Sequence, residues 1–181
     1  MIDENPLRVE DYVEDIKRLS PAEFEERHGD AFLIHNGALA DLRSLLWAQS
    51  TLNEITAVKA VPPGVRPGVR APRSGFLVFE VRSTGRCPFP NMISVGRTRN
   101  NDIVISDVSV SKFHAFFTRG RDGLLYLQDA GSRNGTAVGT VAVPGREGKP
   151  IQIGTFADLR FGSVEMTFLM VNVFRKFVVR F

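Results

Sequence analysis

The chain carries two different hydrophobic patterns, one before residue 60 and one after residue 74. In the first part, apolar residues recur three or four positions apart among charged ones, at Val9, Tyr12, Val13, Ile16 and Leu19. This spacing predicts an amphipathic helix. Ser20, Pro21 and Glu23 predict the start of a second helix, because Ser20 and Glu23 can form a capping box and proline suits the first turn.

The second helix is expected to end by Gly29, before a short apolar run at 31–35 that is compatible with a strand. Residues 39–54 return to helical spacing, with Leu42, Leu45, Leu46 and Trp47. Residues 1–60 are therefore predicted to form a small, mostly α-helical segment.

From residue 74 onward the pattern changes to short apolar runs between loops rich in Gly, Asn, Asp and Ser. Branched and aromatic side chains suit a pleated sheet, so these runs predict strands. They lie at 76–81, 92–95, 103–105, 115–117, 124–127, 136–143, 151–153, 158–161 and 164–169. Many short strands with regular turn signals predict an antiparallel β-sandwich rather than a doubly wound α/β fold.

Two further segments complete the expected organisation. Residues 61–73 contain four prolines and three arginines, which predict an extended linker between the helical segment and a β domain at 74–181. The helical segment is therefore expected to fold as a unit that contacts the β domain loosely or not at all. A nucleic-acid-binding tail is the alternative for this linker, but no aromatic residues interleave with its arginines. The tail 171–181 has apolar residues at helical spacing and predicts a short C-terminal helix closing the sandwich, in preference to a membrane-surface helix.

Composition narrows the class of protein. The 181 residues are 43% hydrophobic and 24% charged, which is typical of a globular protein. A net charge of +3 is mild and does not by itself indicate nucleic acid. The single Cys87 excludes an internal disulfide and fits a reducing compartment. The acidic N-terminus and the lack of a long apolar run predict a cytoplasmic protein without a membrane segment.

Residues 94–136 hold an ordered set of polar residues at the loops between the predicted strands. Gly96-Arg97 comes first, Ser111 and His114 follow with two residues between them, and Asn134-Gly135 closes the set. In this order and on this strand pattern, the chain resembles a forkhead-associated (FHA) domain from about residue 74 to residue 169. The resemblance implies a mainly β, FHA-like sandwich that binds phosphothreonine peptides without catalysis.

The resemblance also implies how the site works. A phosphothreonine carries nearly two negative charges and three acceptor oxygens. The matching positions for binding it are Arg97, Ser111, Lys112, Arg133 and Asn134. A guanidinium fork can hold two phosphate oxygens, a hydroxyl can bind the third, and an amide can anchor the peptide backbone. Gly96, His114 and Gly135 are expected to shape the site without touching phosphate, with Gly96 turning the backbone so that Arg97 points outward.

Other classes of function have weaker support. A serine hydrolase needs a base oriented by a third group, and no Gly-x-Ser-x-Gly elbow is present. One cysteine and three scattered histidines offer no metal-ligand spacing, and no cofactor is expected. The sequence therefore favours a phosphothreonine-dependent recognition module whose partner is a threonine-phosphorylated protein, in signalling by a Ser/Thr kinase. The alternative is a phosphate-independent scaffold that uses the sandwich and the N-terminal helices.

Overall fold

The computed structural model describes residues 6–35, 75–145 and 147–179. Short elements open the chain: strand β1, the 3-10 helix η1, helices α1 and α2, and strand β2. Ten strands, β3 to β12, and the helix α4 follow. The bounds are β1 Leu7–Arg8, η1 Val9–Tyr12, α1 Val13–Arg18, α2 Pro21–His28, β2 Ala31–His35, β3 Leu77–Glu80, β4 Met92–Gly96, β5 Ile103–Val104, β6 Ala115–Arg119, β7 Leu125–Asp129, β8 Thr136–Val138, β9 Val141–Ala142, β10 Ile151–Ile153, β11 Phe156–Phe161, β12 Val164–Met170 and α4 Val171–Val178.

The strands form two sheets packed face to face, as the sequence pattern predicts. One sheet has seven strands in the order β1-β3-β2-β12-β11-β8-β9, and the other has five in the order β10-β7-β6-β4-β5. All pairings are antiparallel except that of β4 with the short β5, which is parallel. The core between the sheets contains large apolar side chains that alternate along the strands, including Phe117, Leu127, Phe161 and Phe168. The fold is therefore mainly β, a sandwich of two sheets, as the resemblance implied.

The N-terminal segment is an integral part of this sandwich. Strand β2 lies inside the seven-stranded sheet, where it pairs with β3 on one side and with β12 on the other. Ala31 and Leu33 point into the core between the sheets, whereas Phe32 and Ile34 point to the opposite face. The expectation that this segment contacts the sandwich loosely or not at all is therefore wrong, because β2 is buried on both faces.

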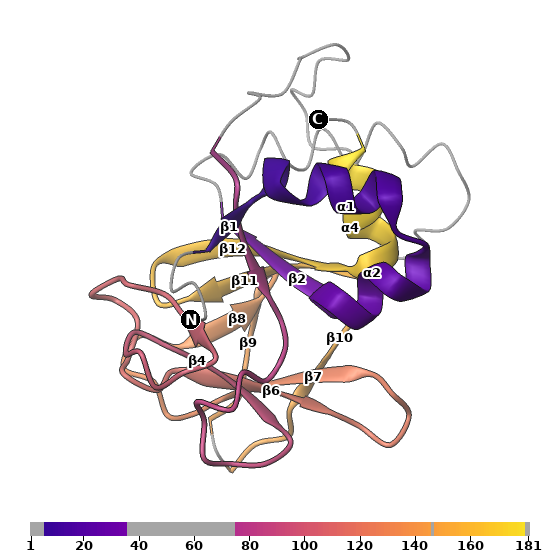
Figure 1. The fold of residues 1–181 in the computed structure, drawn as a ribbon. Helices are drawn as coiled ribbons and strands as arrows, with labels where there is room; N and C mark the ends of the chain where they lie inside the picture. Colours follow the sequence, from indigo (N-terminus) through magenta and orange to yellow (C-terminus); the bar gives the residue numbers. More distant parts are fainter. Residues whose placement is uncertain (1–5, 36–74, 146, 180–181) are drawn as a thin grey trace, which may run out of the picture.

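Helices cover the outer face of the seven-stranded sheet and make a third layer (Figure 1). The N-terminal helices and α4 lie together over β2 and β12, with a second apolar core beneath them. Its centre is aromatic: the Phe174 ring stacks on Phe32 at 3.9 Å between ring centroids and meets Tyr12 edge-on at 5.1 Å. The C-terminal helix thus closes the outer face of one sheet together with the N-terminal helices.

The local signals for α2 are confirmed. Ser20 caps the helix, its side chain accepts a hydrogen bond from the Glu23 backbone N–H, and the Glu23 carboxylate accepts from the Ser20 N–H at 2.8 Å. Proline occupies the first turn. The helix ends at Gly29, whose φ of 89° is a left-handed conformation that favours glycine.

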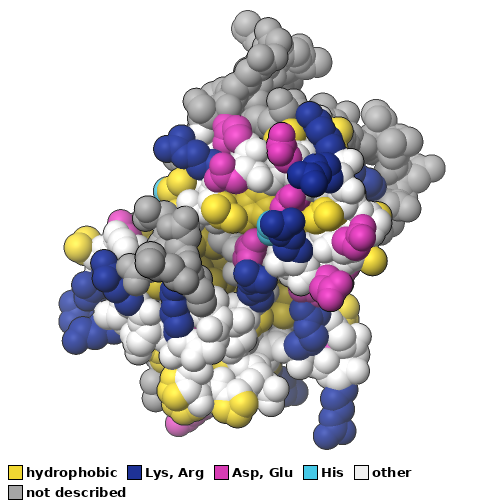
Figure 2. Space-filling model, in the orientation of Figure 1, with side chains coloured by type: hydrophobic (Ala, Val, Ile, Leu, Met, Phe, Trp, Pro, Cys, Tyr) yellow, Lys and Arg dark blue, Asp and Glu magenta, His cyan; other side chains and the backbone are white. Residues whose placement is uncertain are grey.

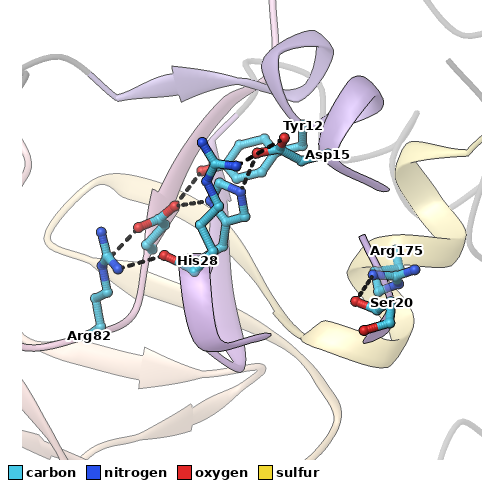
Figure 3. Close-up of polar contacts among 8 residues, drawn as sticks. Tyr12, Asp15, Ser20, His28, Arg82 and Arg175 are labelled. Atoms are coloured by element: carbon cyan, nitrogen blue, oxygen red, sulfur yellow. Dashed lines mark hydrogen bonds and ion pairs between the residues drawn. The ribbon is translucent and has the colours of Figure 1, made fainter. Parts of the chain in front are cut away.

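A polar cluster joins α1, α2 and β3 at the edge of the helical layer (Figure 3). The His28 ring bridges two carboxylates: Nε2 lies 2.9 Å from Asp15 and Nδ1 lies 2.8 Å from Glu80. Glu80 also pairs with Arg82 at 2.8 Å and accepts a hydrogen bond from the Tyr12 hydroxyl. Burial raises the pKa of Tyr12, and the hydrogen bond from His28 holds the pKa of Asp15 below its ordinary value. These contacts hold helices α1 and α2 against strand β3.

Three sequence-based expectations fall wholly or largely on residues outside the described ranges. They are the helix at 39–54, the linker at 61–73 and the division of the chain at residues 60 and 73, which stay predictions. Within the described residues, no helix has the length and apolar character needed to cross a membrane. The same residues contain no group of three or more His, Cys, Asp or Glu side chains suited to a metal ion.

Candidate functional site

Three loops meet at one end of the five-stranded sheet, and hydrogen bonds hold them together. The first loop follows β4, the second lies between β5 and β6, and the third joins β7 to β8. The Arg97 backbone N–H donates to the Ser111 carbonyl at 2.9 Å and connects the first two loops. The Arg133 backbone N–H donates to the Ser111 hydroxyl at 3.1 Å and connects the third. Ser111 is therefore the residue at which all three loops meet.

Arg97 begins the first loop, immediately after the last residue of β4, and its side chain is exposed. Its Nε–H donates to the Val110 carbonyl at 3.2 Å, which fixes the direction of the guanidinium. Its two terminal nitrogens make no hydrogen bond or ion pair with the described residues. The planar fork is therefore positioned by the protein while its outer edge is available to an anion.

Ser111 and Lys112 lie side by side on the second loop. The Ser111 oxygen accepts one hydrogen bond from the third loop, so its own O–H remains available as a donor. Lys112 is exposed, and its backbone carbonyl accepts from Thr98 at 2.9 Å and from Asn101 at 2.7 Å. Hydrogen bonds from the first loop thus fix the backbone of this second loop, while the lysine side chain extends into solvent.

His114 is fully buried beneath these loops. Its Nδ1 accepts a hydrogen bond from the Ser111 N–H at 2.9 Å, so Nε2 carries the proton and donates to the Gly135 carbonyl at 3.1 Å. Burial lowers the pKa of His114, against smaller opposing effects of the Gly135 hydrogen bond and the Asp129 charge. The neutral ring links the second and third loops through backbone groups, and it has no free nitrogen with which to reach a ligand.

The third loop presents Arg133 and Asn134, and both side chains are exposed. One N–H of the Asn134 amide donates to the Ser109 carbonyl at 2.7 Å, which leaves the amide oxygen and the second N–H for a ligand. Gly135 has a φ of 75°, so the expected Asn-Gly turn needs glycine at this position. All five residues matched to phosphate or peptide contacts therefore lie on three connected loops.

The reason for glycine at position 96 differs from the expected one. Gly96 has an ordinary backbone conformation, and it does not need glycine for a turn. A Cβ atom at this position would instead collide with the Lys112 carbonyl and the Asn101 amide. Gly96 is thus required because the first and second loops approach each other closely, and this approach brings Arg97 beside Ser111.

Asp129 is a structural residue of the site that the sequence interpretation did not single out. One carboxylate oxygen accepts from the Gly131 and Ser132 backbone N–H groups, and the other accepts from the Ser132 and Thr136 hydroxyls at 2.6 Å. Burial alone would raise its pKa, but these hydrogen bonds outweigh burial and lower the pKa of Asp129. The sequence signal that could have found Asp129 is its position two residues before Gly131, since an Asp side chain often accepts a hydrogen bond from the backbone two residues ahead.

The charge of the site is positive and uncompensated. Within the described residues, Arg97, Lys112 and Arg133 form no ion pair with a carboxylate, and the nearby Asp129 spends its oxygens on its own loop. Figure 2 shows dark blue Lys and Arg side chains spread over this face of the molecule, several of them at its left edge. Such a surface favours an anionic partner.

Comparison with known proteins identifies the family of this segment. The FHA domain model matches residues 93–162, a range that contains all three loops. No relative with a significant match was found among curated proteins.

Three solved structures illustrate the similarity, and two of them are FHA domains. EmbR of Mycobacterium tuberculosis, solved in complex with a low affinity phosphopeptide, is 24% identical, with a TM-score of 0.39 over 44% of this chain and 20% of its own. The N-terminal FHA domain of Rad53p from S. cerevisiae, solved with a phosphothreonine peptide, is 20% identical, with a TM-score of 0.41 over 47% of this chain and 72% of its own. The FHA domain of the CT664 protein from Chlamydia trachomatis is 28% identical, with a TM-score of 0.37 over 44% of this chain and 74% of its own.

The chain spans about a fifth of the EmbR chain that it matches. The family match covers most of β4, strands β5 to β11 and the three loops that carry Arg97, Ser111 and Asn134. Residues 93–162 of this chain therefore belong to the forkhead-associated domain family.

Proposed function

We propose that this protein binds a threonine-phosphorylated protein through the three loops that carry Arg97, Ser111, Lys112, Arg133 and Asn134. The observation that carries the proposal is the arrangement of Arg97, Ser111 and Asn134, which present a guanidinium edge, a hydroxyl donor and half an amide group on connected loops. None of these groups has a carboxylate partner in the described residues. A phosphate dianion with three acceptor oxygens complements this set.

Binding fits this site better than catalysis. The histidine next to Ser111 is neutral, and backbone groups occupy both of its ring nitrogens. It therefore lacks the free nitrogen that a general base needs to activate a hydroxyl nucleophile. FHA domains have also been solved in complex with phosphothreonine peptides, as in the Rad53p example, and the same ligand class is proposed here.

Phosphothreonine should be preferred to phosphoserine. The phosphate is the same in both ligands, so discrimination depends on the threonine methyl group. Burying one methyl contributes about 0.8 kcal/mol, and the methyl also restricts the first side-chain torsion before binding. The source of the phosphate is proposed to be a Ser/Thr kinase, with the interaction taking place in the cytoplasm.

Calorimetric titration of one peptide in three forms tests the proposal: phosphothreonine, phosphoserine and unmodified. Arg97→Ala should weaken binding of the phosphothreonine form by about 2–5 kcal/mol, because it removes a charge-assisted contact. Arg121→Ala is a matched control, since it removes an exposed arginine from the β6–β7 turn, at the other end of the strands from the site. Equal binding of all three forms, or an unaffected Arg97→Ala variant, would refute the site.

The competing function is a phosphate-independent scaffold, and the observation that favours it is the helical layer. Helices α1, α2 and α4 form a continuous layer whose outer surface lies away from the candidate site (Figure 1). Treating the partner with a phosphatase separates the two functions. Loss of binding supports phosphate recognition, whereas unchanged binding supports the scaffold.

A further inference from the structure

A hydrogen-bond network behind Asn134 connects the site to the turn between β11 and β12. The Ser109 carbonyl accepts from the Asn134 amide, and the Ser109 hydroxyl donates to Asp107 at 2.6 Å. From the other side, the Ser163 backbone N–H donates to the Ser109 hydroxyl at 3.0 Å, and the Ser163 hydroxyl bonds to it at 2.8 Å. Ser109 is thus fixed from two directions by groups that take no part in the proposed ligand contacts.

The Gly162–Ser163 turn also holds Gly135, the residue that follows Asn134 in the chain. The Gly162 backbone N–H donates to the Gly135 carbonyl at 3.0 Å. Gly162 has a φ of 62°, and a Cβ atom there would lie 2.5 Å from the Ser109 carbonyl oxygen. Gly162 and Ser163 therefore support the second and third loops at once, with Asn134 between the two points of contact.

This support matters because an asparagine amide has little orientational preference of its own. The terminal torsion of Asn is broad, so an exposed amide samples many directions unless a hydrogen bond selects one. The bond to the Ser109 carbonyl selects the direction in which the amide oxygen and the second N–H face solvent. An amide held in this way loses less freedom when it binds a peptide backbone.

We propose that Ser109 is a positioning residue for Asn134, and that the Gly162–Ser163 turn braces it from behind. The inference rests on the proposed function, since it assigns the orientation of one of the proposed peptide-binding groups. Ser109 does not touch the ligand in this proposal. It acts only through the Asn134 amide.

A double-mutant cycle with Ser109→Ala and Asn134→Ala tests the proposal in the full chain, titrated with the phosphothreonine peptide. Ser109→Ala should weaken binding about five- to twentyfold, and Ser109→Thr, which keeps the hydroxyl, should restore affinity to within about threefold of the original. In the Asn134→Ala background, Ser109→Ala should change affinity less than twofold, because the group it positions is gone. An equal loss in both backgrounds, or no loss in either, would overturn the proposal.

A measurement made without ligand shows whether this inference or the proposed function has failed. Nitrogen relaxation of the Asn134 side-chain amide reports its order without any peptide. Ser109→Ala keeps the carbonyl that the amide bonds but removes the hydroxyl contacts that fix its position, so it should lower that order toward the level of the exposed Asn91, and Ser163→Ala should lower it less. If no phosphopeptide binds but this loss of order occurs, the positioning holds and the proposed function fails. An amide that stays ordered in a folded Ser109→Ala variant would refute the positioning.

Discussion

Phe32→Ala should destabilise the whole sandwich, because the N-terminal strand carries part of its core. Phe32 is 0% exposed and lies on β2, between strands β3 and β12 of the seven-stranded sheet. Its ring stacks on Phe174 of α4 and lies 5.8 Å from the Tyr12 ring, centroid to centroid. The substitution therefore opens a cavity where strand, N-terminal helix and C-terminal helix meet.

Truncating a buried phenylalanine to alanine typically costs about 3–5 kcal/mol. The upper part of this range applies here, since aromatic rings surround the site and cannot easily collapse into the space. A chain of this size loses about 2–4 °C of Tm per kcal/mol, so a loss of about 4–5 kcal/mol should lower Tm by about 8–20 °C. Phe89→Ala is the matched control: Phe89 is 54% exposed, and its removal should change the free energy of unfolding by no more than about 0.5 kcal/mol.

Urea unfolding should be followed by two probes, far-UV circular dichroism and the amide signals of β4 and β6. If β2 belongs to the sandwich, both probes report one transition, and Phe32→Ala moves it to lower urea concentration for both. Two separate transitions, with the β4 and β6 signals unaffected by Phe32→Ala, would show that the N-terminal segment folds by itself. That result would refute the reasoning from the strand order.

Three further predictions concern the site and the helical layer. Gly96→Ala should weaken phosphopeptide binding at least tenfold in titration, because the added methyl group pushes the Lys112 carbonyl away. The His114 imidazole should titrate below the ordinary histidine value of about 6.5 in an NMR pH titration; the unfolded chain then binds the proton more readily, so this group lowers the free energy of unfolding as pH falls below about 6.5. His28→Gln should lower the free energy of unfolding by about 1–3 kcal/mol in urea denaturation, because a neutral amide cannot replace a ring that bridges two carboxylates.

The β-sandwich and the candidate site could be predicted because their signals are local. Most strands from β3 onward were marked by an apolar run and by turn residues, and the turn at Asn134-Gly135 has the left-handed glycine that its sequence predicts. The site residues form an ordered motif in the sequence, and the strands between its parts bring them to the same end of the sheet. Whether these residues bind phosphate stays a prediction.

The position of β2 could not be predicted from the same kind of signal. The run at 31–34 is apolar at every position, without the alternation of a strand that has one face in water. Such a run is typical of a strand buried on both faces, but it does not say which strands lie beside it. The proline-rich segment after it suggested separation, yet a long connection does not prevent two strands from pairing in space. Pairing of β2 with β12 depends on residues more than 130 positions apart, Ile34 and Thr167 for example.

The supporting residues of the site were missed for a similar reason. Ser109 is a common loop residue, and nothing in its immediate neighbours distinguishes it from solvated surface, whereas the local signal at Asp129 was only a glycine two residues ahead. The importance of Ser109 comes from partners outside its own loop, Asn134 and Ser163, which lie 25 and 54 residues away in the sequence. Asp129 instead bonds groups of its own loop. A sequence motif indicates which groups face the ligand. Which residues position those groups depends on the packing of the whole domain.

The strand order also connects the N-terminal segment to the candidate site. Strand β2 pairs with β12, and β12 leads back through the Gly162–Ser163 turn that supports Ser109 and Gly135. A fragment beginning at residue 74 would lack β2, so the backbone groups of β12 from Thr167 to Met170 would lose their partners on one side. It would also expose Leu169 and Phe174, which belong to the core under the helices. The affinity of such a fragment would therefore reflect a damaged sheet as well as the loops, and the contribution of Arg97 or Ser109 is best measured in the full chain.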